Sequence, residues 1–509
     1  MTKRIFCFLT ALALALSGFA CASGTSRFII GTVYQRGAAI NPLYCTQRDL
    51  VSVNNLVFEG VMTLSDELRP TPELCLSYSV NGKTVTFELR QNVRFHDGTY
   101  LSANDVYESY RRIKNIGENS PYYNRCQYIS KMEVVDLYTV RVTGEYESLM
   151  TLYAMTYPVL HRNTLDETLP TGTGPYMYNY SDGDWIQLDA NPYWWKKAPV
   201  VDTVYIYRYD ETGDALKALT SGEVNAVPTR SQTAALGRLL NDRMSVDYST
   251  LTYEMLIPNN KKLIFSDIRT RQAIMYAIDT SVIAKNIYMD MVMESEVPVI
   301  TGSWLYEPQS AVYYKSPERA LMLLKEAGWG DYNNDGILDK VVDGVLSQLE
   351  FTITTCVDDA ANTRAHAAEL ISDQLKLLGI SVSVKTVTKS TLQKRLKNGD
   401  FEMVLCGINL SIMPDLTFLL NSSGRMNYSG YSSAEMNTLL RKLYDTTDET
   451  AFKSIMSQIQ LKIAEDLPFM GLFFRKGTLM TTSQVSGLGA IIEGDVFKGF
   501  EYIEFLETR

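Results

Sequence analysis

The sequence predicts an α/β protein built from domains whose segments interleave along the chain. Segments that alternate apolar and polar residues, as strands do, are followed repeatedly by segments with apolar residues at helical spacing. This succession of strands and helices runs through the whole chain and favours sheets covered by helices. The 509 residues contain no low-complexity linker and no internal repeat, and a chain of this length forms roughly two to four domains.

The first part of the chain shows this pattern clearly. Residues 27–34 are apolar enough for a strand, and residues 49–58 have the spacing of a helix. Residues 84–90 then alternate as a half-buried strand does. A helix is expected to begin at Ser102, because Asp105 stands three residues later, as in a capping box, and an apolar stripe follows.

The same pattern continues to about residue 387. The remaining expected strands span 201–209, 349–355 and 380–387, and the remaining expected helices span 214–219, 268–286, 317–327 and 363–378. Pro317 and Gly379 stand where helices typically begin and end. The glycine-rich turn at 171–176 has no following lysine and no helix start, so we expect no phosphate site there.

Residues 1–22 have the layout of a secretory signal. Lys3 and Arg4 precede an apolar stretch at 5–16, and small residues follow. The stretch is too short to span a bilayer. Two interpretations of the processing stay open, since Cys21 fits either ordinary cleavage between small residues or the lipidated first residue of an anchored protein. We expect the mature protein in the periplasm or on the outer face of the cytoplasmic membrane, soluble or tethered at Cys21.

Composition and motifs exclude several classes of function. The net charge of -10 and the absence of a basic block predict no nucleic-acid partner. The chain has no GxSxG, GxxxxGK[ST] or HExxH motif, and only 3 histidines, so we expect neither an enzyme nor a histidine-rich metal site. The five cysteines beyond the export region show no metal-like spacing, which favours small buried residues over a disulfide framework.

One loop has the oxygen spacing of a calcium site. It begins at Asp331, continues through Asn333, Asp335 and Gly336, and reaches Asp339. The twelfth position, where a bidentate acid should stand, is Val342, so the coordination shell is incomplete. A polar surface turn is therefore the favoured interpretation, and no metal site is expected.

Several short blocks, in their order along the chain, resemble the oligopeptide- and dipeptide-binding proteins of ABC importers. The blocks are Glu59-Gly-Val61, Thr84-Val-Thr-Phe-Glu-Leu-Arg90, Phe95-His-Asp-Gly98, Ala103-Asn-Asp-Val106, Thr171-Gly-Thr-Gly-Pro-Tyr176, Asn191-Pro-Tyr-Trp194, Ala218-Leu-Thr-Ser-Gly-Glu-Val224, Phe265-Ser-Asp-Ile-Arg-Thr-Arg-Gln-Ala-Ile274, Ala277-Ile-Asp279 and residues 320–329. Each block is weak by itself, but the combination is specific and covers nearly the whole mature chain.

This resemblance implies a two-lobed periplasmic-binding-protein fold of type II, in its three-domain peptide-binding variety. Domain I would combine residues 27–56, 172–258 and 481–509, domain II would span 57–171, and domain III would span 259–480. The ligand would lie between domains I and III, which close over it. The implied function is that of an extracytoplasmic component of an ABC importer, which captures peptides and delivers them to permease subunits in the membrane. We expect a monomer without a cofactor.

Other functions stay open on the same fold. Similar proteins carry nickel chelates, haem, glutathione or short glycans, and the scarcity of histidine makes direct nickel ligation the weakest of these. A signalling or adhesive surface protein could also have kept the fold. A hydrolase is a further alternative, for which the sequence offers no nucleophile and base.

The resemblance also implies where a ligand would bind. In the peptide-binding relatives an extended peptide adds a strand to the protein, so that backbone hydrogen bonds supply affinity. The matching segment here contains Gly407, Ile408 and Asn409, which we expect to contact the ligand backbone. The other expected ligand-binding residues are Tyr44, Gln47 and Arg48 in a loop near the ligand, Tyr122 facing the cleft, and Asn259 near the crossing strands.

Ser411 departs from the family pattern. Relatives that bind free peptides have an Asp seven residues before the Phe that corresponds to Phe418, and this Asp pairs with the peptide amino terminus. Loss of that contact would cost about 2–3 kcal/mol unless another acid substitutes. Asp415 is a candidate substitute. Otherwise the ligand lacks a free amino terminus or is not a peptide.

Overall fold

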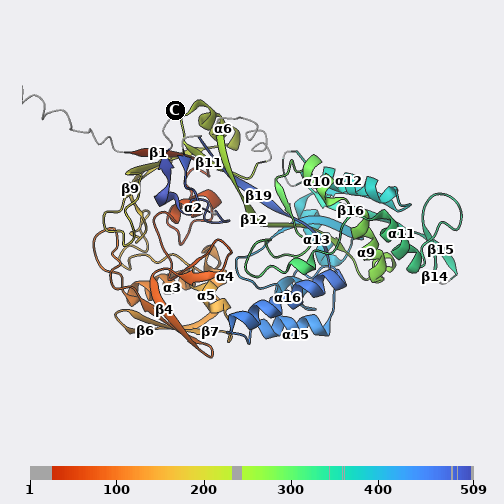
Figure 1. Ribbon diagram of the computed structural model, residues 1–509, viewed down its shortest axis with the longest axis horizontal. Coiled ribbons are helices and arrows are strands. Elements are labelled where there is room, and N and C mark those ends of the chain that lie inside the picture. Colours follow the sequence, from red (N-terminus) through yellow and green to blue (C-terminus); the bar gives the residue numbers. More distant parts are fainter. Residues whose placement is uncertain are drawn as a thin grey trace, which may run out of the picture.

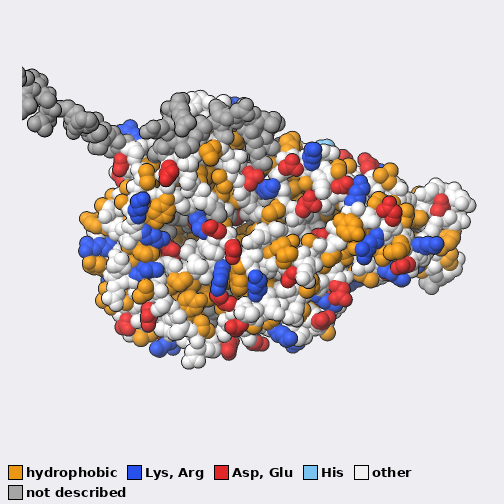
Figure 2. Space-filling model, in the orientation of Figure 1, with side chains coloured by type: hydrophobic (Ala, Val, Ile, Leu, Met, Phe, Trp, Pro, Cys, Tyr) orange, Lys and Arg blue, Asp and Glu red, His pale blue; other side chains and the backbone are white. Residues whose placement is uncertain are grey.

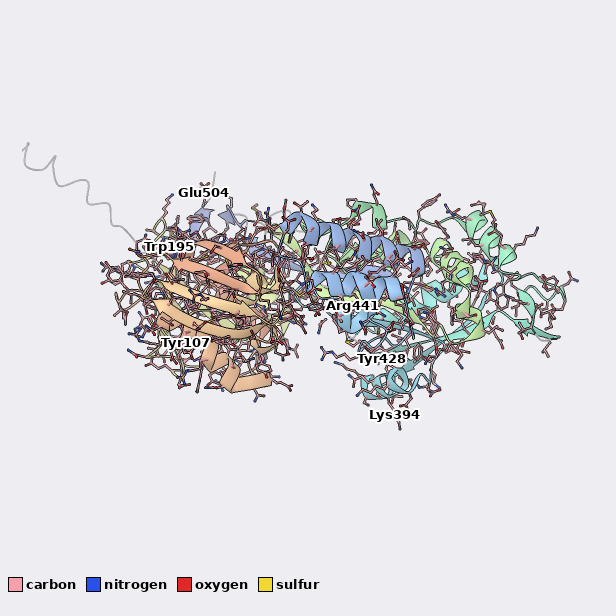
Figure 3. All side chains as sticks on the ribbon, turned by 90° about the horizontal axis from the view of Figure 1, so that it is seen from below. Tyr107, Trp195, Lys394, Tyr428, Arg441 and Glu504 are labelled. Carbon is pink, nitrogen blue, oxygen red and sulfur yellow. The ribbon has the colours of Figure 1, made fainter. Side chains whose placement is uncertain are left out.

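The two lobes of the chain lie side by side and share one large sheet (Figure 1). The computed structural model describes residues 26–231, 243–342, 344–357, 359, 361–482, 485–489 and 491–505. In Figure 1 the left-hand lobe holds both the N-terminal strand and the orange segments near residue 100, and the right-hand lobe holds the green and light-blue segments. Figure 3 shows the same two lobes from below, with Tyr107 in one and Tyr428 and Lys394 in the other.

The large sheet has eleven strands within the described residues. Ten follow the order β17 (Ser381–Val387), β16 (Glu350–Cys356), β18 (Met403–Asn409), β12 (Arg243–Pro258), β19 (Met470–Thr482), β11 (Ala226–Thr229), β1 (Arg27–Val33), β10 (Thr203–Tyr209), β9 (Trp185–Ala190) and β8 (Tyr176–Ser181), and β13 (Val292–Glu294) pairs with β19. β1 is parallel to β10 and β11, and β16 is parallel to β17 and β18, whereas the other pairs are antiparallel.

β12 and β19 are the long central strands, and two glycines let them pack closely. A Cβ at Gly471 would overlap the hydroxyl of Tyr253, and a Cβ at Gly477 would overlap the ring of Tyr248. Both tyrosines come from β12 and are buried. The register of the pair shifts between Ser249 and Tyr253, which is the irregularity expected of a bulge.

The left-hand lobe adds a smaller sheet and several helices. The sheet has the order β4 (Cys75–Asn81), β5 (Thr84–Leu89), β7 (Thr139–Gly144), β6 (Ile129–Asp136). The other elements are α2 (Arg48–Asn54), β2 (Met62–Leu64), β3 (Pro70–Pro72), α3 (Ala103–Ile116), η1 (Gly117–Asn119), α4 (Tyr123–Cys126), α5 (Met150–Ala154), α6 (Thr212–Ser221), β20 (Val485–Ser486), η3 (Phe500–Tyr502) and β21 (Glu504–Phe505).

Helices cover the part of the sheet that belongs to the right-hand lobe. They are α8 (Leu263–Ser266), α9 (Ile268–Ala277), α10 (Thr280–Asn286), η2 (Pro308–Ser310), α11 (Pro317–Glu326), α12 (Thr363–Lys376), α13 (Lys389–Asn398), α14 (Thr417–Leu420), α15 (Ala434–Leu443) and α16 (Glu449–Asp466). A two-stranded hairpin of β14 (Asp339–Val342) and β15 (Val345–Gln348) projects at the far end of this lobe (Figure 1). Figure 3 shows α15, with Arg441, beside α16.

Most predicted elements are confirmed to within a few residues, including the capping box. The Asp105 carboxylate accepts from the Ser102 amide at 3.0 Å and from its hydroxyl at 2.6 Å. The single helix predicted over 268–286 is wrong, because α9 ends at Ala277 and α10 begins at Thr280. The Asp279 side chain accepts from the Val282 amide at 3.1 Å and thereby starts a second helix.

Among the described residues, the cysteines and many other apolar side chains are buried, whereas most charged side chains lie on the surface. Cys45, Cys75, Cys126, Cys356 and Cys406 are all buried and unpaired, as the favoured interpretation predicted. On the face seen in Figure 2, acidic and basic side chains are interspersed. The core consists mainly of two clusters. One runs through the left-hand lobe and continues to α13, α15 and α16 of the right-hand lobe, and the other lies within the right-hand lobe.

Candidate functional site

β18 has a backbone edge that is only partly paired. Its pairing with β12 continues to Asn409, whereas among the described residues its pairing with β16 stops at Val404. The Leu410 amide donates to the Leu251 carbonyl at 2.8 Å. Because an antiparallel pair alternates bonded and non-bonded positions, the backbone groups of Gly407 and Asn409 point away from β12, toward the unpaired edge.

The loop that follows β18 lies where the lobes meet. Ile412 lines three cavities of about 250, 60 and 250 Å³, whose walls come from both lobes. Ser411 and Asp415 line the smallest of them. Residues 410–416 therefore form one wall of the space between the lobes. Sequence reasoning did not single out Ile412, since one apolar residue in a loop carries no signal of its own.

Tyr122 forms part of the opposite wall. It lines the same cavity as Ile412, together with Arg125, whose guanidinium lies 5.2 Å from the centre of the Tyr122 ring. Burial raises the pKa of Tyr122 to about 12, so its hydroxyl stays protonated at neutral pH. The structure thus brings together the predicted tyrosine and the loop after β18.

The predicted loop at 44–48 lies apart from these cavities. Tyr44 accepts a hydrogen bond from Arg112 at 2.9 Å, and the Gln47 carbonyl accepts from the Val51 amide at 2.9 Å. Arg48 is exposed and is the first residue of α2. None of the three belongs to the residues that line the three cavities around Ile412.

Asp415 is held by groups of both lobes. Its Oδ2 atom accepts from the Tyr128 hydroxyl at 2.5 Å and from the Tyr444 hydroxyl at 2.8 Å, and its Oδ1 atom accepts from the Thr417 amide at 2.9 Å. Tyr128 belongs to the left-hand lobe and Tyr444 to the right-hand lobe. In this arrangement the carboxylate links the lobes, and its acceptor positions are largely used.

Asn259 anchors the end of β12. Its side-chain nitrogen Nδ2 donates to the carbonyls of Gly399 and Phe401, each at 3.1 Å, and its side-chain oxygen accepts from the backbone amide of Lys261 at 3.2 Å. The side chain is buried. These contacts fix the point at which the chain enters the right-hand lobe.

A buried ionic cluster supports the unpaired edge of β18. Glu254 is fully buried, and Arg364 forms two hydrogen bonds with its carboxylate, each 2.9 Å long. Arg475 donates to the same carboxylate at 2.6 Å. Despite the opposing effect of burial, the two guanidinium groups lower the pKa of Glu254 to about 2. A Cβ at Gly407 would lie 2.7 Å from both Arg364 Nη2 and Glu254 Oε1, so only glycine fits there.

Glu493 brings a second acid to the space between the lobes. It lines two of the three cavities around Ile412. Its Oε1 atom lies 3.5 Å from Arg230 Nη2, and its buried Oε2 atom has no hydrogen-bond partner among the described residues. Its sequence context gave no reason to select this residue.

Comparison with known proteins identifies the family. Residues 69–430 match the profile described as bacterial extracellular solute-binding proteins, family 5 Middle. The chain belongs to this family. Over 476 residues it is 27% identical to the oligopeptide-binding protein AppA of Bacillus subtilis, and the alignment covers 88% of this chain and 86% of that protein. It is 23% identical over 464 residues to heme-binding protein A of Haemophilus influenzae, covering 83% of this chain and 82% of that protein.

The solved structures agree on the fold of this solute-binding protein. A structure described as a nickel ABC transporter from Bacillus halodurans superimposes with a TM-score of 0.82 at 19% identity and covers 92% of this chain and 98% of that one. The family and the periplasmic-binding-protein fold predicted from the sequence are therefore confirmed. Both curated relatives are named as binding proteins. Within the described residues, no helix is long and apolar enough to cross a membrane.

Proposed function

We propose that this solute-binding protein is the extracytoplasmic receptor of an ABC importer and that it captures peptides between its lobes. The unpaired edge of β18 is the observation that carries the proposal, since an extended peptide can add to it as a further strand. Gly407 and Asn409 would supply the backbone contacts, whereas the expected backbone contact of Ile408 is replaced by its pairing with Tyr253 of β12. Backbone hydrogen bonds of this kind do not depend on the side chains of the ligand, which suits a receptor for many peptides.

The proposed domain division is the one expected from the sequence. Residues 27–56, 172–258 and 481–509 would form domain I, residues 57–171 domain II and residues 259–480 domain III. β12 and β19 lie in the middle of the shared sheet, so they are the proposed hinge. The cavities beside Ile412 are small, which means that a peptide would enter after the lobes have moved apart.

Side chains around the cavities would complete the site. Tyr122 would pack against the ligand from domain II, and the loop with Tyr44, Gln47 and Arg48 would approach only a ligand longer than these cavities. Asp415 is engaged with two tyrosines. We therefore propose Glu493, with its unpartnered Oε2 atom, as the acid that pairs with a peptide amino terminus in place of the residue missing at Ser411.

Native mass spectrometry of the purified protein tests the class of ligand. A series of bound peptides is the expected result, and a single non-peptide mass in all preparations would count against the proposal. Calorimetry with those peptides then tests the strand addition.

The matched variants for calorimetry are Asn409→Pro and Asn409→Ala. The side chain of Asn409 is exposed, and its backbone N–H points toward the unpaired edge. Proline at this position removes that one backbone donor, at an edge that tolerates proline. We expect binding to weaken about tenfold in Asn409→Pro and to change little in Asn409→Ala. Equal affinities of the two variants would exclude strand addition at this edge. Gly407 is unsuitable for this test, since any side chain there would enter the ionic cluster.

A non-peptide ligand is the second candidate, and the serine at 411 favours it. Without a free acid at this end of β18, a ligand without an amino terminus loses nothing by binding there. A relative named for haem binding and a solved structure described as a nickel ABC transporter support this alternative. Haem absorbs visible light, and bound nickel is detected by elemental analysis, so either would be recognised in the purified protein.

The remaining expectations stay proposals. Residues 1–22 and Cys21 lie outside the described residues, so export and lipid attachment are proposed from the sequence alone. Mass spectrometry of the mature amino terminus decides between ordinary cleavage and lipidation at Cys21. We also propose that the protein is a monomer without catalytic activity, cofactor or nucleic-acid partner. Unchanged peptides after incubation, and a monomer mass in light scattering, are the expected results.

A further inference from the structure

The loop from Asp331 to Asp339 places three carboxylates close together, far from the cavities between the lobes. The loop follows α11 and leads into β14, at the right-hand end of the molecule in Figure 1. Carboxylate oxygens of Asp331, Asp335 and Asp339 lie within 4.8 Å of one another. Asp331 and Asp335 are exposed, whereas Asp339 is buried.

Asp339 is the residue that requires an explanation. Its exposed fraction is 0%, and neither of its carboxylate oxygens has a hydrogen-bond partner among the described residues. A buried carboxylate without partners is costly, and two further carboxylates nearby increase the cost. The neighbouring cation does not relieve it, because Lys340 Nζ donates to the Ala327 carbonyl at 2.7 Å and lies 5.7 Å from the centre of the Trp329 ring.

The backbone holds the three acids in place. The amides of Asp335 and Gly336 donate to the Asp331 carboxylate at 3.1 and 3.0 Å. The two ends of the loop are joined, since Gly330 and Asp339 exchange backbone hydrogen bonds of 2.9 and 2.6 Å. The oxygens of the buried acid are thus directed at the other two acids by a closed loop.

We propose that this loop binds a calcium ion. Asp331, Asp335 and Asp339 would supply carboxylate oxygens, the carbonyl of Ile337 would supply a fourth ligand, and water would complete the shell. These residues occupy positions 1, 5, 7 and 9 of a calcium loop, and Gly336 occupies the sixth. The sequence favoured a simple turn because Val342 leaves the twelfth position without an acid, but the two unpartnered oxygens of Asp339 can take over that role.

Calcium fits this loop better than magnesium does. Calcium accepts six to eight oxygen ligands in irregular geometry, whereas magnesium requires a near-ideal octahedron and keeps its water. A loop with three acids and one carbonyl is typical of weak extracellular sites, with dissociation constants of about 10⁻⁴ to 10⁻³ M. Bound calcium would neutralise most of the local charge and tie the end of α11 to the hairpin.

Thermal unfolding of the chelator-treated full-length protein tests the proposal. Addition of millimolar CaCl₂ should raise the Tm by a few degrees, since an ion that binds only the folded state stabilises it. Asp339→Asn should abolish this shift. In EDTA the variant should unfold at the same temperature as the wild type or a higher one, because it removes an uncompensated buried charge. Asp373→Asn, which changes an exposed acid of α12, is the matched control and should respond to calcium as the wild type does.

Terbium luminescence gives a second readout that does not depend on stability. Tyr332 lies inside the loop and Trp329 lies two residues before it, so excitation of these rings should sensitise bound Tb³⁺. Calcium should compete the emission away, and Asp339→Asn should lack it. An equal calcium shift in the wild type and Asp339→Asn, or no calcium response of the wild type in either measurement, would overturn the proposal. Neither measurement involves a peptide, so the outcome is independent of the proposed transport function.

Discussion

The charge of Glu254 should contribute measurably to the stability of the whole protein. Its carboxylate is fully buried between Arg364 and Arg475, and its pKa is lowered from 4.5 to about 2. A pKa shift of this size contributes about 3 kcal/mol to the free energy of unfolding at neutral pH. Loss of one partner from a buried ion pair costs about 3–5 kcal/mol in general, which agrees. Glu254→Gln should therefore destabilise the protein by about 3 kcal/mol at pH 7.

Urea unfolding at several pH values is the assay. Because the folded pKa is depressed, the contribution is complete well above pH 4.5 and is lost as the pH falls through about 2. The difference between wild type and Glu254→Gln should thus shrink to less than half by about pH 3. Glu133→Gln, at a surface acid paired with Lys131, should leave the stability almost unchanged. A difference below about 1 kcal/mol at pH 7, or one that does not depend on pH, would refute the reasoning.

Two further changes test the space between the lobes. Tyr128→Phe removes a hydrogen bond to the Asp415 carboxylate. If this contact forms on closure, ligand binding should weaken by about tenfold to a hundredfold in calorimetry, while Tyr314→Phe, at an exposed ring, should leave it unchanged; equal affinities would show that the contact does not assist closure. Glu493→Gln should weaken binding of a peptide with a free amino terminus by about tenfold or more and spare the same peptide after N-acetylation. Equal losses for both peptides would remove Glu493 as the ammonium partner.

Much of the fold could be predicted from local patterns. Strand β5 alternates in burial as its sequence does. The break between α9 and α10 could not be predicted by periodicity, because Ile278 continues the apolar spacing across it. The break arises from the Asp279 cap, which competes locally with the continuing helix.

The site was less accessible to sequence reasoning. Resemblance to a family directed attention to the segment around Gly407, but not to the cluster beneath it. Glu254 stands in an alternating strand where a polar residue normally faces water, and its partners Arg364 and Arg475 are more than a hundred residues away in the chain. Such a cluster becomes visible only when β12, β19 and α12 are packed together. In the loop from Asp331 to Asp339 the spacing of the acids could be recognised in the sequence. The burial of Asp339, on which the calcium proposal depends, could not.

The place of β19 in the sheet has a consequence for how this protein is made. β19 lies between β12 and β11, although it is formed by residues 470–482, near the end of the chain. A chain emerging from a ribosome therefore cannot join the two parts of its main sheet until residues 470–482 have been delivered. Contacts between segments so distant in sequence form slowly. The unfinished chain would expose strand edges throughout this time, which is compatible with the proposed export of the chain before it folds.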